Sequence, residues 1–313
     1  MHFSDSFFKG EERCGFFVSS FMKRCWAAQI EVLLSFDSIC QAHGIRYFAA
    51  YGTLLGAVRH KGFIPCDDDL DIWVFRKDMD KLIMLGREEY EAYGLELATP
   101  YSDVEYRNLT FRLINTRVTR LDEDFLLKYH GFPHMAGLDL FPLDNVPDKE
   151  EDLKFTETLL ASANVLAQIW KNDEVPLEEK MSAYDVLAET LHLQPAKDTT
   201  IENQLWQLSD RMCAMFNEED TEYVAAYTYM FADRRKKFKK ISFNDTLYLD
   251  FESIKLPVPA GYEDVLLAEF GDDYMTPKQL FDEHEYPYYR SWQDKLMKYF
   301  EANGIKCPDM FKE

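Results

Sequence analysis

The sequence predicts an α+β fold, in which a mixed β-sheet flanked by helices precedes a mostly helical second region. Helical and strand-like segments alternate up to about residue 147, which is typical of such a core. From residue 148 to about 238, long amphipathic stretches carry few strand signals. With 313 residues, the chain has room for one large domain or two modest ones. We therefore expect a core with an N-terminal helix over residues 1–147, and a mainly helical substrate or lid region over residues 148–313.

The elements of the first half follow from the spacing of apolar residues. They recur at helical spacing over residues 16–43, and Gly44 stands where a left-handed cap would end that helix. A short helix is also expected over residues 53–59, with Thr53 near its start. The remaining elements expected here are a helix over residues 78–90 and strands over residues 46–50, 69–75, 95–98, 109–115 and 137–141.

The second half contains three further features. Strand-like alternation near residues 245–260 predicts a short β segment, and residues 262–270 predict a helix that ends at Gly271. Another helix is expected after Tyr286. Residues 234–240 form the one basic cluster of the chain, which is either a solvated face or a contact for an anionic substrate.

The charge of the chain limits the classes of partner. It has 56 acidic and 35 basic residues, a formal net charge of -21. Proteins that bind nucleic acid depend on clustered Lys and Arg, so we expect no nucleic-acid partner. An anionic membrane surface is disfavoured for the same reason. A nucleotide is still permitted, because its phosphates can be held through bound cations.

Cysteine spacing and hydropathy indicate the cellular compartment in which the protein is expected. The six cysteines are scattered without a CxxC pair, which favours reduced thiols over a disulfide framework. There is no signal-peptide pattern at the N-terminus, and no window approaches the roughly 18 apolar residues of a membrane helix. We therefore expect a cytoplasmic protein without a transmembrane segment.

The densest charge is a run of four aspartates within residues 67–71, which repel one another unless a cation neutralises them. Asp69 and Asp71 are two positions apart at a strand entry, so they point to the same face, roughly 6 to 7 Å apart. A third carboxylate, Asp139, lies on another expected strand between apolar neighbours. Such hard oxygens suit Mg²⁺ or Mn²⁺, and three on one face would serve phosphoryl-type displacement. A solvated loop or a structural calcium loop is the alternative, although the EF-hand spacing is missing.

A possible phosphate site precedes these aspartates. Gly52 and Thr53 stand at a helix start, where backbone amides and the helix dipole favour a phosphate. Arg59, His60 and Lys61 follow the helix and could neutralise further phosphate charge, although each alone is more often a surface residue.

Three motifs resemble the LicD/fukutin-related family of the DNA polymerase β-like nucleotidyltransferase superfamily. The first comprises the G-T-L-L-G helix start at residues 52–56, the R-H-x-G-F-I-P stretch at 59–65 and the D-D-D-x-D-I strand at 67–72. The second is D-L-F-P-L-D-N-V-P at residues 139–147. The third joins V-P-A-G-Y at residues 258–262 to F-G-D-D-Y-M-T-P at 270–277. Cys66 departs from the tryptophan common in the family, and Phe270 replaces a tyrosine.

The resemblance implies a nucleotidyltransferase-like fold and a metal-dependent transfer of a phosphorylated alcohol, such as phosphocholine. The donor would be a CDP-alcohol or another nucleotide, and the acceptor a glycan of lipopolysaccharide, teichoic acid or another surface polysaccharide. Asp69, Asp71 and Asp139 would be the catalytic metal ligands, with Asp139 serving as a metal ligand, as the base that takes the hydroxyl proton, or as both. Asp67 would support substrate binding, with Gly52 and Thr53 on the phosphate side.

Two rival functions stay open at the level of sequence. Many proteins of this superfamily move a nucleoside monophosphate from a triphosphate to a small molecule, a sugar phosphate or a protein. A non-catalytic binding member of the fold is the other possibility, which the retained carboxylates of Asp69, Asp71 and Asp139 disfavour.

Overall fold

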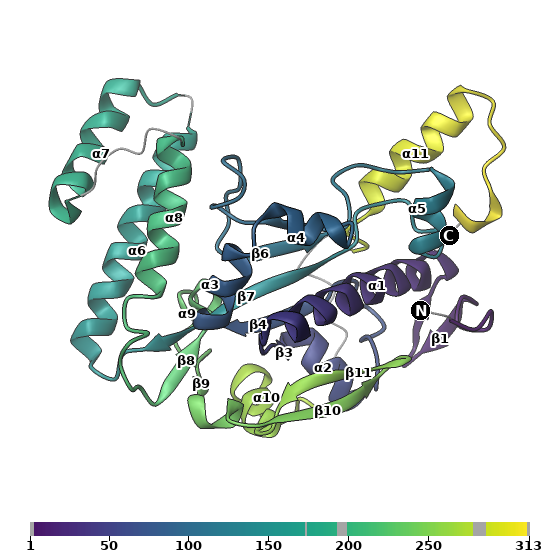
Figure 1. Cartoon of the computed structure of the whole chain (residues 1–313), viewed down its shortest axis with the longest axis horizontal. Coiled ribbons are helices and arrows are strands. Elements are labelled where there is room, and N and C mark those ends of the chain that lie inside the picture. Colours follow the sequence, from purple (N-terminus) through teal and green to yellow (C-terminus); the bar gives the residue numbers. More distant parts are fainter. Residues whose placement is uncertain (1–2, 173, 193–198, 278–285, 312–313) are drawn as a thin grey trace.

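The computed structural model describes residues 3–172, 174–192, 199–277 and 286–311, and a seven-stranded sheet lies at its centre (Figure 1). The strand order is β3-β4-β7-β6-β5, with β8 paired to β7 and β9 paired to β8. Strands β4 (Asp71–Phe75) and β7 (Gly137–Val146) run parallel, whereas the other pairs are antiparallel, which confirms the predicted mixed sheet and α+β fold. The other strands of the sheet are β3 (Phe48–Ala49), β5 (Glu96–Ala98), β6 (Phe111–Ile114), β8 (Tyr223–Ala225) and β9 (Phe238–Lys239).

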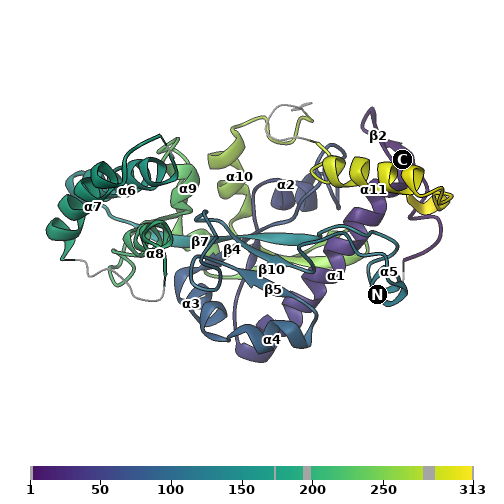
Figure 2. The ribbon, with the colours of Figure 1, turned by 90° about the horizontal axis from the view of Figure 1, so that it is seen from above.

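Helices cover both faces of this sheet. Figure 2 shows α2 (Tyr51–Arg59) and α10 (Tyr262–Phe270) on one side of the central strands and α3 (Arg76–Met84) and α4 (Arg87–Ala92) on the other. The long helix α1 (Ser20–His43) packs against β7 and buries fourteen of its residues. As predicted, α1 ends at Gly44, which takes the left-handed conformation at φ 61°.

The second half is largely helical, as expected, but it also extends the sheet. Helices α6 (Glu150–Lys171), α7 (Leu177–Leu191) and α8 (Ile201–Cys213) lie together at one end of the molecule, opposite the end where both termini lie (Figure 1). Strand β8 pairs with residues 144–146 of β7, so the sheet runs across the expected division at residue 147. Strands β8 and β9 have only three and two residues, too few to produce a readable alternation. The two-part division itself stays a prediction.

Several element boundaries differ from expectation for local reasons. The helix expected over residues 78–90 is two helices, because Gly86 adopts φ 79° between them. Residues 16–18 form a strand instead of the first helical turn. The elements not yet named are β1 (Glu11–Arg13), β2 (Phe16–Val18), the hairpin β10 (Thr246–Phe251) and β11 (Ile254–Pro259), helices α5 (Glu123–Lys128), α9 (Tyr227–Met230) and α11 (Arg290–Ala302), and 3₁₀ turns at Lys240–Phe243 and Asp309–Phe311.

A buried ion-pair network centred on Arg76 joins the helical region to the sheet. Arg76 begins α3 and is only 7% exposed. Its Nε and Nη2 donate to the two carboxylate oxygens of Asp144 on β7, both at 2.8 Å, and its Nη1 donates to Asp210 of α8 at 2.9 Å. Asn217 and Tyr101 donate to the same two carboxylates. This network therefore fixes α8 against the C-terminal half of β7.

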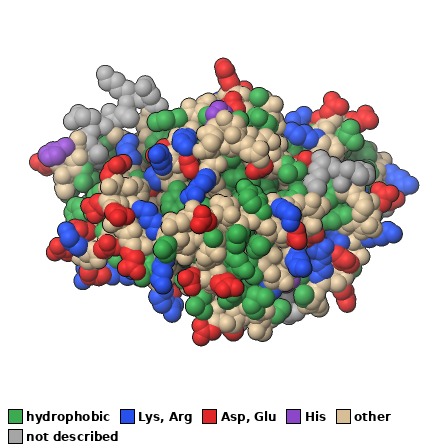
Figure 3. All heavy atoms as spheres, turned by 60° about the horizontal axis from the view of Figure 1, so that its bottom comes forward, with side chains coloured by type: hydrophobic (Ala, Val, Ile, Leu, Met, Phe, Trp, Pro, Cys, Tyr) green, Lys and Arg blue, Asp and Glu red, His purple; other side chains and the backbone are tan. Residues whose placement is uncertain are grey.

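The surface is mixed in charge. Figure 3 shows acidic and basic side chains interspersed among apolar ones over one face of the molecule. All six cysteines are free thiols. Within the described ranges, no helix combines the length and the apolar character that crossing a bilayer requires.

Replacing Arg76 with Met should lower the free energy of unfolding by about 3 to 5 kcal/mol, because Asp144 and Asp210 would be left buried without their cation. Urea unfolding followed by circular dichroism measures this. The control is Arg87→Met, which removes an ion pair to Glu91 at a side chain that is 85% exposed and should change stability little. Equal stability of the two variants would show that the Arg76 network does not hold the two regions together.

Candidate active site

Several segments that are far apart in the sequence line one cavity of about 1060 Å³. This volume is at the upper end of small-molecule sites, so the cavity has room for more than a metal ion. Of the residues predicted to form a site, the cavity is lined by Gly52, Arg59, Asp67, Asp69, Asp71 and Asp139. The other three, Thr53, His60 and Lys61, do not line it.

Strand register places Asp71 and Asp139 side by side. Asp71 is the first residue of β4 and is directly opposite Asp139 on the parallel strand β7. On the other side of β7, Arg112 of β6 is opposite Asp139. Residues directly opposite on neighbouring strands project from the same face, so these three side chains form a row across the sheet. We call Asp71, Asp139 and Arg112 the charged row.

The carboxylates of the charged row are electrostatically strained. Burial raises the pKa of the Asp71 carboxyl well above its ordinary value of 3.8, and the neighbouring charges of Asp69, Asp139 and Asp67 raise it further. Burial also raises the pKa of Asp139, where Arg112 partly offsets the effect. Asp71 therefore lies among like charges in a poorly solvated position, and a cation beside it would lower the energy of its ionised form.

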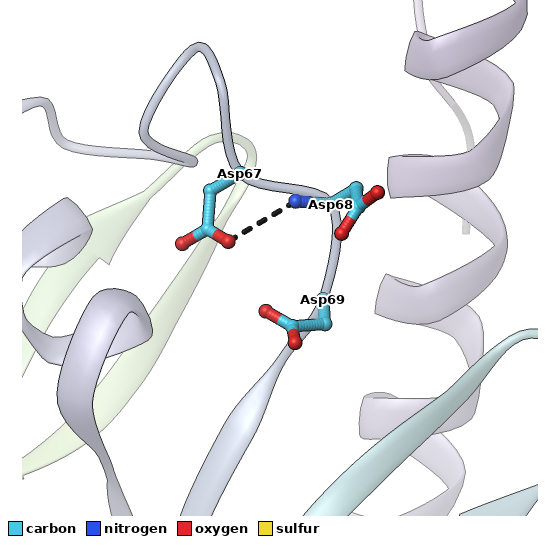
Figure 4. Close-up of side chains that lie close together, drawn as sticks. All are labelled: Asp67, Asp68 and Asp69. Atoms are coloured by element: carbon cyan, nitrogen blue, oxygen red, sulfur yellow. Dashed lines mark hydrogen bonds between the residues drawn. The ribbon is translucent and has the colours of Figure 1, made fainter. Parts of the chain in front are cut away.

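Most of the aspartate run lies before strand β4. Strand β4 begins at Asp71, so Asp69 precedes it instead of standing within it as expected. Leu70 and Ile72 are fully buried, as predicted for the opposite face. In Figure 4 the carboxylates of Asp67 and Asp69 lie on one side of the loop, and Asp68 turns away from them.

Asp68 is held in place by hydrogen bonds to two other parts of the chain. It is fully buried, and its Oδ2 accepts a hydrogen bond from the backbone N–H of Tyr288 at 2.7 Å. Its carbonyl oxygen accepts from Nε2 of Gln29 on α1 at 2.5 Å. Asp68 therefore anchors the loop to α1 and to the chain before α11, and it lines the cavity together with Asp67 and Asp69.

The start of α2 contacts the aspartates directly. A Cβ at Gly52 would lie 2.5 Å from Oδ2 of Asp67, so only glycine permits this close approach. The hydroxyl of Thr53 accepts a hydrogen bond from the backbone N–H of Asp71 at 2.8 Å. Thr53 is buried and thus positions the first residue of β4, a location behind the cavity wall. No side chain caps the N-terminus of α2, whose Ncap residue is Ala50.

The basic residues after α2 differ in their surroundings. Arg59 lines the cavity, and its Nη1 donates to the carbonyl oxygen of Tyr274 at 2.7 Å. Burial, with the charges of Arg59 and Arg13, lowers the pKa of His60 to about 4, so His60 is neutral near pH 7 and adds no charge for a phosphate. Lys61 is exposed, and its carbonyl oxygen accepts from the N–H of Glu252.

Two further cations line the cavity that were not among the predicted site residues. Arg112 is the polar position in the apolar strand β6, and alternation alone does not reveal what lies opposite it. Lys236 belongs to the basic run at residues 234–240; it lines the cavity, pairs with Glu269 at 2.8 Å and lies over the ring of Tyr229. Arg234 instead pairs with Glu150 and Glu157 of α6. Within that run, Lys236 therefore reaches the cavity and Arg234 does not, and a contact with an anionic substrate stays a prediction.

The donor set fits a hard divalent cation. Asp67, Asp68 and Asp69 each offer a carboxylate oxygen, and these oxygens lie within 4.8 Å of one another. Asp71 and Asp139 add carboxylates in the same cavity. Oxygen ligands of this kind suit Mg²⁺ or Mn²⁺. The raised pKa of Asp71 reflects burial and repulsion from neighbouring carboxylates, and a cation would relieve that repulsion.

Comparison with known proteins assigns part of the chain to a domain family. The profile of the LicD/FKTN/FKRP nucleotidyltransferase domain matches residues 44–162, the segment that contains α2, the aspartate run and β7. The chain carries a LicD-family domain. This confirms the resemblance read from the three motifs.

Relatives of this chain include one that is named for an activity. The lipopolysaccharide cholinephosphotransferase LicD of Haemophilus influenzae is 23% identical over 252 residues, which cover 80% of this chain and 90% of that protein. Uncharacterized proteins of Rickettsia prowazekii and Rickettsia typhi are each 58% identical over 36 residues, which cover 12% of this chain and 14% and 12% of theirs.

The three motifs of the chain meet at the cavity. The second motif contributes Asp139 and Phe141, and the third contributes residues 270, 273, 274 and 276. The first contributes Gly52, Leu55, Arg59, Ile64, Cys66, Asp67, Asp68, Asp69 and Asp71. The hydrogen bond from Arg59 to the carbonyl of Tyr274 joins the first motif to the third. Segments 200 residues apart in the chain are therefore parts of one site.

Replacing Asp71 with Asn should stabilise the protein when divalent cations are removed with EDTA. The folded-state pKa of Asp71 is raised above 3.8, so its contribution to stability is complete below pH 3.8 and is lost as pH rises through the raised value. The thermal unfolding midpoint of the variant should therefore exceed that of the wild type by a margin that grows as the pH rises above about 4. Mg²⁺ should then stabilise the wild type more than the variant. A variant no more stable than the wild type at pH 7 in EDTA would contradict the repulsion inferred here.

Proposed function

We propose that this chain is a metal-dependent phosphotransferase. It would move a phosphorylated alcohol, such as phosphocholine, from a CDP-activated donor to a hydroxyl group of a surface glycan, in lipopolysaccharide or a related polymer such as teichoic acid. Mg²⁺ or Mn²⁺ would be its cofactor.

The pairing of Asp71 with Asp139 in one large cavity carries this proposal. It supports the assignment because two carboxylates from parallel neighbouring strands, with Asp69 close by, form the kind of oxygen-rich site that phosphoryl transfer uses. The similarity to a lipopolysaccharide cholinephosphotransferase over 80% of the chain supports the choice of donor and acceptor. The proposal needs no nucleic-acid partner and no transmembrane segment.

Each part of the cavity has a role in this scheme. Asp69, Asp71 and Asp139 would hold the cation, which would neutralise charge on the donor diphosphate. The uncapped N-terminus of α2 presents backbone amides beside Gly52, and these favour a phosphate oxygen. Asp67 lies against that turn and limits the approach of the donor. Arg59 holds the segment of the third motif as part of the cavity wall.

The reaction breaks the phosphoanhydride bond of the donor and forms a phosphate ester bond to the glycan. The glycan hydroxyl oxygen forms a bond to the phosphorus of the transferred group, and the bond from that phosphorus to the bridging oxygen breaks, so that CMP leaves. The proton of the hydroxyl passes to a carboxylate of the cavity. In this scheme Asp139 would share the cation, take that proton, or do both.

With CDP-choline, Mg²⁺ and a bacterial lipopolysaccharide acceptor, we expect CMP release together with an acceptor mass increase equal to phosphocholine. Replacing Asp71 with Asn should lower turnover at least about 100-fold, because the charge that would hold the cation is lost. The matched control is Asp250→Asn on β10, whose side chain is 62% exposed and pairs with Lys255.

The same assay separates the rival functions. Pyrophosphate release from CTP or ATP, without CMP release from CDP-choline, would identify a nucleotidyltransferase. Normal turnover in the Asp71→Asn variant would remove the charged row from the mechanism. Absence of divalent binding by calorimetry would favour a non-catalytic member of the fold.

A further inference from the structure

Arg112 holds both oxygens of the carboxylate that a cation at the charged row would use. Its Nε donates to Oδ1 of Asp139 at 2.9 Å, and its Nη2 donates to Oδ2 at 3.3 Å. This is a two-pronged pairing, in which the guanidinium neutralises Asp139. A divalent cation bound between Asp71 and Asp139 would therefore compete with Arg112 for the same oxygens.

Arg112 is also accessible to a ligand in the cavity. It lines the cavity, and its side chain is 46% exposed, compared with 24% for Asp139. Its guanidinium presents a planar fork of donors that matches the oxygens of a phosphate as well as those of a carboxylate. The guanidinium of Arg112 can exchange the carboxylate of Asp139 for a phosphate while β6, the strand that carries Arg112, stays folded.

The other cations lining the cavity have partners that metal binding would not displace. Arg59 donates to the backbone carbonyl of Tyr274, and Lys236 pairs with Glu269, whose side chain is 4% exposed. Among these three cations of the described cavity lining, Arg112 alone is paired with a carboxylate of the charged row.

We propose that Arg112 is a phosphate-binding residue that Asp139 holds until a divalent cation takes its place. Cation binding at Asp71 and Asp139 releases the guanidinium, which then binds the diphosphate of the donor. Metal and donor would thus bind in order, because the metal frees the residue that the donor needs. The proposal rests on the proposed function for the identity of the donor, but not for the exchange of partners at Asp139.

Binding measurements without turnover test this exchange. The probes are Mn²⁺ alone and inorganic pyrophosphate with saturating Mn²⁺, both measured by isothermal titration calorimetry. In Arg112→Gln, Mn²⁺ should bind at least about 3-fold tighter, because Asp139 no longer has a competing cation. Pyrophosphate should bind at least about 10-fold weaker, because the fork of donors is missing.

Two further variants complete the design. Arg117→Gln is the matched control: its side chain is 47% exposed, it pairs with Glu96 and Asp103, and it does not line the cavity, so both affinities should stay unchanged. Arg112→Lys keeps the charge but not the fork, so it should weaken pyrophosphate binding by a smaller factor than Arg112→Gln. It provides the test if the Gln variant does not fold. Thermal unfolding checks that each variant is folded.

The reciprocal variant removes the carboxylate. In Asp139→Asn, pyrophosphate should bind more tightly than in the wild type even without Mn²⁺, and this gain should disappear in the double variant Asp139→Asn/Arg112→Gln. Unchanged pyrophosphate affinity in Arg112→Gln, or Mn²⁺ binding that is unchanged or weaker, would overturn the proposal. Because neither probe contains cytidine or an alcohol, the expected shifts would stand even if CDP-choline proved not to be the donor.

Discussion

The repulsion among carboxylates at the entry of β4 is the constraint on which the rest of the site depends. Asp71 is surrounded by the charges of Asp69, Asp139 and Asp67 and is poorly solvated, so its pKa is raised well above the ordinary value. A fold that only needed stability would place neutral residues there. A bound cation would make the arrangement favourable, and in the proposed function the ionised aspartates would hold the phosphates of an anionic donor through that cation.

Much of the scaffold holds these charges in place. Thr53 fixes the backbone of Asp71, Gly52 leaves room for Asp67, and Asp68 anchors the loop through Gln29 and Tyr288. At the other end of β7, the pairs from Arg76 to Asp144 and Asp210 attach the helical region to the same strand that carries Asp139. Strand β7 therefore connects the carboxylate site with the helices α6, α7 and α8.

The sequence predicted those parts that depend on local patterns. Helix α10 and the end of α1 at Gly44 followed from periodicity and glycine placement, and the aspartate run identified the region of the site. What it did not predict depends on pairing between distant segments. The register that sets Arg112 against Asp139, the short strands β8 and β9, and the position of Lys236 in the cavity arise only when the chain is folded. The roles given to the predicted site residues stay predictions.

The central claim is that the charged row is a divalent-cation site. The most direct measurement is anomalous diffraction from crystals soaked in Mn²⁺, with data collected near the manganese absorption edge. The account predicts an anomalous peak within bonding distance of carboxylate oxygens of Asp71 and Asp139, with Asp69 nearby and Arg112 turned away from Asp139. No peak in the cavity at saturating Mn²⁺, or a peak bound elsewhere with Arg112 still paired to Asp139, would contradict it.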